Sequence, residues 1–74
     1  MSTPCFVIRY RAPSDPNGNP RRLYIVYNAN ETIESIYDEG YKGYAALPDR
    51  FHNLPKVDVD VSATTYRQFA KGAN

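Results

Sequence analysis

The chain has 74 residues, of which 42% are hydrophobic and 23% are charged, and its formal net charge is +1. A chain of this length has room for one small core, so we expect residues 1–74 to fold as a single domain. The near-zero net charge excludes an overall field that would select nucleic acid or an anionic membrane. No apolar run approaches the roughly 20 residues of a transmembrane helix.

The N-terminal residues and the cysteine count indicate the cellular location. No basic segment followed by an apolar one is found at the N-terminus, so it does not resemble a signal peptide. The one cysteine, Cys5, excludes an intramolecular disulfide and fits a reducing compartment. We therefore expect a cytoplasmic protein.

The charges are distributed unevenly along the chain. Residues 1–22 contain four basic residues and one acidic residue, a net charge of +3. Residues 23–49 contain five acidic residues and one basic residue, a net charge of −4, and residues 50–74 return to +2. A basic first segment followed by an acidic middle favours oriented docking onto a partner with matching patches. Ordinary mixed surface charge is the alternative explanation.

Two apolar runs in the first half predict a β-hairpin. Residues 5–11 alternate in character, with Ile8 and the aromatic side chains on one face, which is the period of a strand. Residues 22–28 carry large side chains on both faces, which favours a central strand. The connector, residues 12–20, contains three prolines around an Asn-Gly pair and is predicted to be a loop.

Residues 28–40 fit either a helix or a strand. In a helix, Asn30 would cap the start and Gly40 would end it. The apolar side chains would then share one stripe, formed by Ile33, Ile36 and Tyr37. In a strand, residues 32–37 would pair back onto residues 22–28, and their β-branched content favours this. We predict the helix because the apolar spacing fits a period of 3.6 better than a period of 2.

The last third of the chain predicts a strand followed by a helix. Residues 44–55 are expected to be irregular, with one short helical turn. Residues 56–61 alternate valine with aspartate, which predicts a strand with the valines inward and the aspartates in solvent. Ser62 suits the N-cap of a helix over residues 63–71 that ends at Gly72. The buried stripe of this helix would consist of Tyr66, Phe69 and Ala70. The predicted fold class is α+β, a small antiparallel sheet in β-β-α-β-α order with helices packed on one face.

Support for catalysis is weak. Cys5 and His52 are the plausible nucleophile and base, and nothing in their spacing brings them together. We expect Cys5 to be a buried, unreactive thiol and His52 to be a surface residue. Asp58 and Asp60 share a strand face but lack an evident third metal ligand, so solvated carboxylates are expected. The sequence thus predicts a protein that is not an enzyme and that has no cofactor and no metal site.

The segment Gly40-Tyr-Lys-Gly43 resembles the G-x-x-G loop of KH domains, which clamps a nucleic-acid backbone between two helices. The predicted order of elements over residues 5–61 is similar to that of the prokaryotic type of this family. Two acidic residues precede the loop, where the family has an apolar entry, and only Lys42 would attract phosphate. The resemblance implies binding of single-stranded RNA or DNA through the Gly40–Gly43 loop as the alternative function.

Tyrosine is unusually frequent, with seven residues in 74. Exposed tyrosine near arginine is typical of protein-binding hot spots and also of surfaces that stack single-stranded bases. An alternative interpretation places the rings at the rim of the core, with their hydroxyl groups in contact with water. The low net charge and the acidic middle favour protein binding. The predicted contact surface consists of the hairpin residues and the loop that follows: Arg9, Arg11, Arg21, Arg22, Tyr24, Tyr41, Lys42 and Tyr44.

In its size, single domain and lack of enzymatic motifs, the chain resembles small phage-encoded host-takeover proteins. These include regulators that bind bacterial RNA polymerase and alter transcription. The resemblance rests on general character and on no specific motif. It implies a non-enzymatic, regulatory protein-binding module of viral origin, with host RNA polymerase as a candidate partner.

Overall fold

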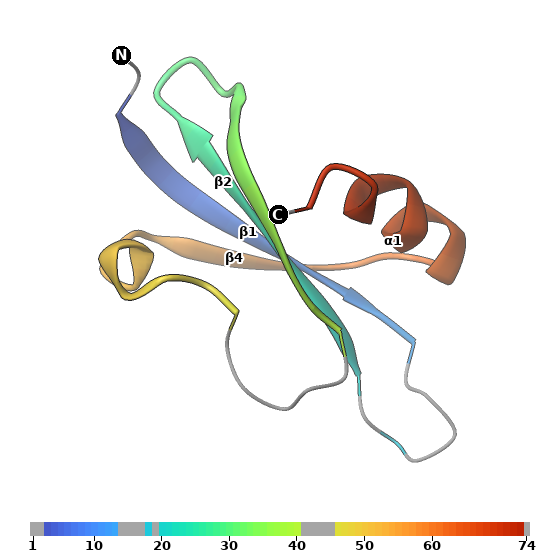
Figure 1. Cartoon of the computed structure of the whole chain (residues 1–74). Helices are drawn as coiled ribbons and strands as arrows, with labels where there is room; N and C mark the ends of the chain where they lie inside the picture. The colour runs from blue at the N-terminus through green and yellow to red at the C-terminus, as the bar shows by residue number, and fades with distance from the viewer. Residues whose placement is uncertain (1–2, 14–17, 19, 41–45, 74) are drawn as a thin grey trace.

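The computed structural model describes residues 3–13, 18, 20–40 and 46–73. Figure 1 shows the arrangement of four strands, one 3-10 turn and one α-helix. In chain order these are β1 (Pro4–Ala12), β2 (Arg21–Asn28), β3 (Ile33–Gly40), η1 (Asp49–Phe51), β4 (Lys56–Asp60) and α1 (Ala63–Ala70). The predicted α+β class is therefore confirmed.

The sheet has the strand order β3-β2-β1-β4 and is mixed. β1 pairs with β2, and β2 with β3, in antiparallel fashion, whereas β4 runs parallel to β1. The predicted antiparallel sheet in β-β-α-β-α order was wrong, because the described residues form β-β-β-η-β-α with one helix. Residues 41–55 connect β3 at one edge of the sheet to β4 at the other, and a parallel neighbour requires a crossover of this kind. The predicted hairpin and the central position of residues 22–28 are confirmed.

The segment predicted as a helix forms strand β3, and a β-bulge explains the error. Ile33 lies opposite Tyr27, whereas Ser35 lies opposite Val26, so the pairing shifts by one residue at Glu34. In a regular strand, every second side chain points to the same face. Where a bulge adds one residue, two side chains that are three positions apart point to the same face. Ile33 and Ile36 therefore point to one face of the sheet. Their helix-like spacing is produced by the bulge.

The turn before β3 is organised by Asn28, not by the predicted cap Asn30. The Asn28 side-chain carbonyl accepts hydrogen bonds from the backbone N–H groups of Asn30 at 2.9 Å and Thr32 at 3.2 Å. Its amide donates to the Thr32 hydroxyl at 2.7 Å. Glu31 has φ of 63°, a left-handed conformation that ends any helical path. These contacts close a β2–β3 hairpin.

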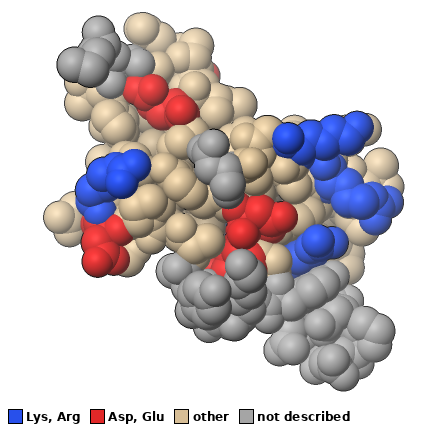
Figure 2. All heavy atoms as spheres, in the orientation of Figure 1, with Lys and Arg blue, Asp and Glu red and all other residues tan. Residues whose placement is uncertain are grey.

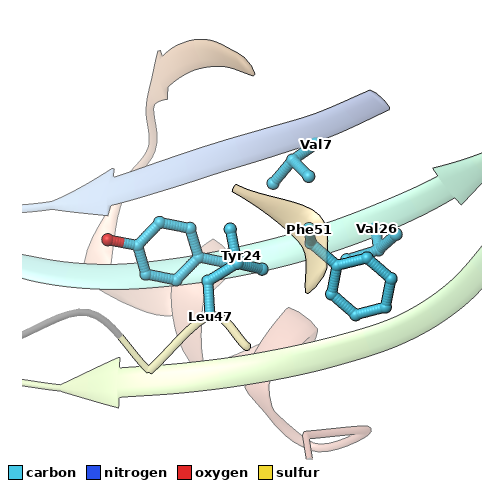
Figure 3. Close-up of a cluster of buried hydrophobic side chains, with 5 residues drawn as sticks. All are labelled: Val7, Tyr24, Val26, Leu47 and Phe51. Atoms are coloured by element: carbon cyan, nitrogen blue, oxygen red, sulfur yellow. The ribbon is translucent and has the colours of Figure 1, made fainter. Parts of the chain in front are cut away.

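Both faces of the sheet are covered, and each carries its own apolar cluster. We call the first the helix face, because Tyr66 of α1 packs there on Ala12, Leu23 and Ile25. The second, the loop face, is covered by the irregular segment that contains η1. Its buried cluster, drawn in Figure 3, consists of Val7, Tyr24, Val26, Leu47 and Phe51. The one α-helix packs on a single face, although two helices were predicted there, and the predicted irregular segment with one helical turn is confirmed for residues 46–55.

Helix α1 forms as the sequence predicts. Ser62 is the N-cap, and its hydroxyl accepts a hydrogen bond from the Thr65 N–H at 3.1 Å. Tyr66 is 1% exposed, and Phe69 and Ala70 pack beside it. The amphipathic stripe and the cap therefore specify both the start of the helix and the face that it buries.

Strand β4 lies at an edge, and its side chains are less buried than its pattern predicts. Val57 is 55% exposed, so the expectation that it points into the core was wrong. Val59 is half-buried, and Asp58 and Asp60 are exposed as predicted. An edge strand has a neighbouring strand on one side only. Its side chains therefore have fewer neighbours to pack against and remain more exposed.

Candidate functional site

The structure separates the eight predicted contact residues into three groups. Strand alternation and the register place Arg9, Arg11, Arg22 and Tyr24 on the loop face, with Arg9 opposite Tyr24 and Arg11 opposite Arg22. Arg21 lies on the helix face, where its guanidinium carbon is 5.0 Å from the centroid of the Tyr66 ring. The remaining three lie outside the described residues: Tyr41, Lys42 and Tyr44.

Arg9 and Arg11 of β1 face two carboxylates of β4 in register. Arg9 makes a two-pronged contact with Asp58, in which Nε donates to Oδ1 at 2.6 Å and Nη2 donates to Oδ2 at 2.7 Å. Arg11 donates from Nε to Oδ1 of Asp60 at 3.1 Å. We call these four residues the charged ladder. Planar fork-to-fork pairing fixes the direction of the guanidinium group as well as its distance.

The electrostatics of the ladder follow from these contacts. The hydrogen bond from Arg9 lowers the pKa of Asp58 below its ordinary value, with a smaller contribution from the nearby charge of Arg11. The same contact raises the pKa of Arg9, against the opposing effect of burial. Asp58 is therefore ionised at neutral pH, and the ladder presents fixed, alternating positive and negative groups.

Sequence reasoning missed these partners because it treated Asp58 and Asp60 as solvated strand acids. A signal was present, since Arg-x-Arg and Asp-x-Asp have the same spacing of two residues. That signal becomes specific only once β1 and β4 are known to be neighbours, which the parallel pairing provides.

Tyr24 does not belong to an exposed contact surface. Its side chain is 4% exposed, and its hydroxyl donates to Oε2 of Glu39 at 2.8 Å. Burial raises the pKa of Tyr24, and the hydrogen bond to Glu39 raises it further. The ring fills the loop-face cluster, as Figure 3 shows, while the hydroxyl holds a carboxylate.

Glu39 is a buried acidic residue that the sequence did not single out. It is 1% exposed, and Nη1 of Arg22 lies 3.5 Å from its Oε1. Among the described residues, that oxygen accepts no hydrogen bond. A second register shift, between Arg22 and Leu23, places this carboxylate beside Tyr24. Arg22 and Tyr24 therefore form a support for Glu39 next to the charged ladder.

A small apolar pocket lies at the other end of the loop face. Its volume is about 420 Å³, it opens to solvent, and it is lined by Pro4, Arg50, Phe51 and Leu54. The Arg50 guanidinium carbon lies 4.5 Å from the centroid of the Phe51 ring. These residues could contact an apolar ligand and, through Arg50, an anionic group, but none of them is a nucleophile or a general base.

The surroundings of Cys5 and His52, the candidate nucleophile and base, are as follows. Cys5 is exposed, so the expectation of a buried thiol was wrong. His52 is exposed as predicted, and its Nε2 lies 2.9 Å from the Leu47 carbonyl oxygen. Within the described part of the chain, no three potential metal ligands cluster together.

Basic side chains also gather outside the ladder. Figure 2 shows most of the visible basic atoms on the side of the molecule where α1 lies, with one basic group beside acidic atoms on the opposite side and further acidic atoms at the centre. Arg67 of α1 and the following Lys71 are exposed. Because these two residues are exposed and do not belong to the ladder, substitutions of them can serve as controls for substitutions in the ladder.

No family model matches the chain, and neither a curated protein nor a solved structure shows significant similarity to it. In the described residues, no helix has the length and apolar character needed to cross a membrane.

Proposed function

We propose that the chain is a non-enzymatic protein-binding module and that the charged ladder is the centre of its contact surface. The observation that carries this proposal is the two-pronged Arg9–Asp58 contact between neighbouring strands. A rigid sheet holds these charges at fixed positions, so that binding orders few side chains and loses little conformational entropy. Complementary charges on a partner then give orientation and specificity.

The mixed charge of the ladder favours a protein partner over nucleic acid. Each ladder arginine already faces a carboxylate, so a phosphate would have to compete with Asp58 or Asp60. The alternative KH-like function required a helix before the Gly40–Gly43 loop. That segment is strand β3, so no observation favours the alternative.

A charge-swap variant tests the proposal without removing the internal ion pair. Arg9→Asp combined with Asp58→Arg keeps one positive and one negative group in register but reverses their order on the surface. Affinity for a partner captured by the parent chain should fall about tenfold or more, because like charges then oppose each other. Arg67→Asp on α1 is the matched control and should bind as the parent does.

Purified bacterial RNA polymerase is the first partner to test, because the resemblance to host-takeover proteins implies it. Affinity capture from a bacterial lysate with mass spectrometry extends the search to other proteins. Circular dichroism establishes that the swap variant is folded. Recovery of the same partners with unchanged affinity by the folded swap variant would contradict the proposal.

A further inference from the structure

Strand β4 presents an unpaired edge on the outer side of the sheet. Among the described strands it pairs with β1 alone, and four of its five residues are exposed: Lys56, Val57, Asp58 and Asp60. The exposed edge of a sheet is a template for another strand, and short charged edges usually discourage such pairing. The charges of β4 have a particular order that permits one pairing and opposes others.

The backbone direction in β4 can be derived from its contacts with β1. The Val7 N–H donates to the Pro55 carbonyl at 2.9 Å, and the Val61 N–H donates to the Arg11 carbonyl at 2.9 Å. Backbone groups of successive residues point to opposite sides of a strand. The odd-numbered residues of β4 therefore face β1. The N–H and C=O groups of Lys56, Asp58 and Asp60 face outward.

We infer that two copies of this chain pair through their β4 strands, antiparallel and centred on Asp58, to form one continuous sheet. In this register Lys56 of one copy lies opposite Asp60 of the other, and the reverse pair repeats across the two-fold axis. The pairs that exchange backbone hydrogen bonds are then the same residues whose backbone groups face outward. Hydrogen-bonding geometry therefore permits this register over the full length of β4, and opposite charges favour it at both ends of the strand.

The side chains of the other face also match in this register. Val57 of one copy lies opposite Val59 of the other, at the closer spacing of a non-hydrogen-bonded pair. This contact covers Val57, which is 55% exposed in the single chain. The like-charged Asp58 pair at the centre is the one opposing feature, and each carboxylate there is held by its own Arg9.

Other pairings of the two edges are less favourable. Shifting the register by two residues in either direction shortens the overlap and removes backbone hydrogen bonds. One shift also places Asp58 opposite Asp60; the other places Lys56 opposite Asp58 and Val57 opposite Val57, and the crosslinking experiment below distinguishes it. The opposite edge, β3, contains three acidic residues and no basic residue, so self-pairing there brings like charges together: Glu34, Asp38 and Glu39. The β4 edge is the self-complementary one.

Charge reversal at the two ends of β4 tests this dimer. Sedimentation equilibrium of the full chain should show a mass that rises from one copy to two with concentration. Lys56→Asp or Asp60→Lys alone places like charges opposite each other at both ends and should weaken dimerisation about tenfold. Combining the two substitutions restores opposite charges and should recover the dimer. Denaturation curves establish that each variant is folded.

Crosslinking tests the register itself. In a Cys5→Ser background, the Val57→Cys chain is mixed with the Val59→Cys chain under mild oxidation. The predicted pair has the short Cα separation that a disulfide needs, so the mixed species should form in excess over either self-linked species. A monomer at all concentrations overturns the inference. The inference is also overturned if the dimer's affinity is unchanged by charge reversal and the mixed crosslink forms no more often than the self-linked species.

Discussion

The two faces of the sheet share the same strands but are covered in different ways. On the helix face, α1 lays Tyr66 over Leu23 and Ile25, and the apolar cluster extends along the helix. On the loop face, the described part of the irregular segment, residues 46–55, packs on Val7 and Val26, whereas the side chains of the charged ladder are 32–77% exposed. The loop face therefore has a part that packs against the irregular segment and, beside it, an exposed part. The candidate site lies in the exposed part.

Each face also holds one buried tyrosine that binds a carboxylate. Tyr66 contacts Asp38 and donates to the Arg22 carbonyl at 2.8 Å, and Tyr24 donates to Glu39. Asp38 is half-buried, whereas Glu39 is 1% exposed. The Tyr24 hydroxyl therefore stabilises a carboxylate, Glu39, that has almost no contact with water. The Tyr66 hydroxyl contacts a carboxylate, Asp38, that is partly exposed to water.

Matched leucine truncations should show the largest difference between the faces. Leu23→Ala on the helix face should cost about 4–5 kcal/mol of unfolding free energy, because the side chain is fully buried in the central strand. Leu47→Ala on the loop face should cost about 2–3 kcal/mol, because an irregular segment relaxes into the cavity more easily. Urea denaturation measures both values, and at protein concentrations where the chain is a monomer, Val57→Ala should change stability by less than about 0.5 kcal/mol, because Val57 is 55% exposed there. Equal costs for the two leucines would contradict this account of the covers.

Removing the two hydroxyl groups should produce the next largest effect. Tyr24→Phe should cost about 2–3 kcal/mol, because it leaves the buried Glu39 carboxylate without its hydrogen bond. Tyr66→Phe should cost about 1–2 kcal/mol, because it removes the hydroxyl that lies between the Arg22 carbonyl and the half-buried Asp38 carboxylate, and water can reach Asp38 in its place. The same denaturation experiment ranks the pair, and a larger loss for Tyr66→Phe would reverse the comparison.

The helix face could be predicted from the sequence because its signals are local. Ser62, Tyr66 and Phe69 specify the start and the buried stripe of α1 within one short segment. The alternation of β1 and β2 likewise specifies the first hairpin. These patterns depend on neighbours close in the chain, so no knowledge of the topology was required.

The loop face could not be predicted because its contacts join distant segments. Asp58 and Asp60 pair with arginines 49 positions earlier, and only the parallel crossover brings β4 to β1. The bulge at Glu34 disguised a strand as a helix, since it gave two isoleucines a spacing of three residues. Eight contact residues were predicted from the frequency and clustering of basic and tyrosine side chains, which do not show that Tyr24 is buried.

Alkaline pH should destabilise the protein through three buried or half-buried tyrosines on its two faces. Burial raises the pKa of Tyr24, Tyr27 and Tyr66, and hydrogen bonds to neighbouring side chains add to this effect. In the unfolded chain these groups ionise near the ordinary value of 10.0. Above that pH the folded state binds more protons than the unfolded state, so stability falls as pH rises.

The slope of this loss should be at most about 1.4 kcal/mol per pH unit for each tyrosine. Urea denaturation between pH 8 and pH 11, with tyrosinate absorbance as the probe of ionisation, measures it. Tyr24→Phe should make the curve flatter, because one titrating group is gone. A stability that is constant across this range would contradict the burial of these hydroxyl groups.

The smallest effect on stability should come from the charged ladder, and the coupling energy should differ between its two ion pairs. A double-mutant cycle with Arg9→Gln and Asp58→Asn should give a coupling energy of about 0.5–1 kcal/mol. The cycle at Arg11 and Asp60 should give about 0.2 kcal/mol, because one contact is made and the Asp60 side chain is 77% exposed.

The larger coupling should disappear in acid. Arg9 lowers the pKa of Asp58, so the unfolded state takes up the proton first as pH falls. The stabilisation is therefore present above the unfolded value of 3.8 and is lost progressively below it. Repeating the cycle at pH 3 and at high salt separates this ion pair from packing effects. If the coupling at Arg9 survives protonation of Asp58, the pair is held by packing, and its charges are not what fixes the geometry of the ladder.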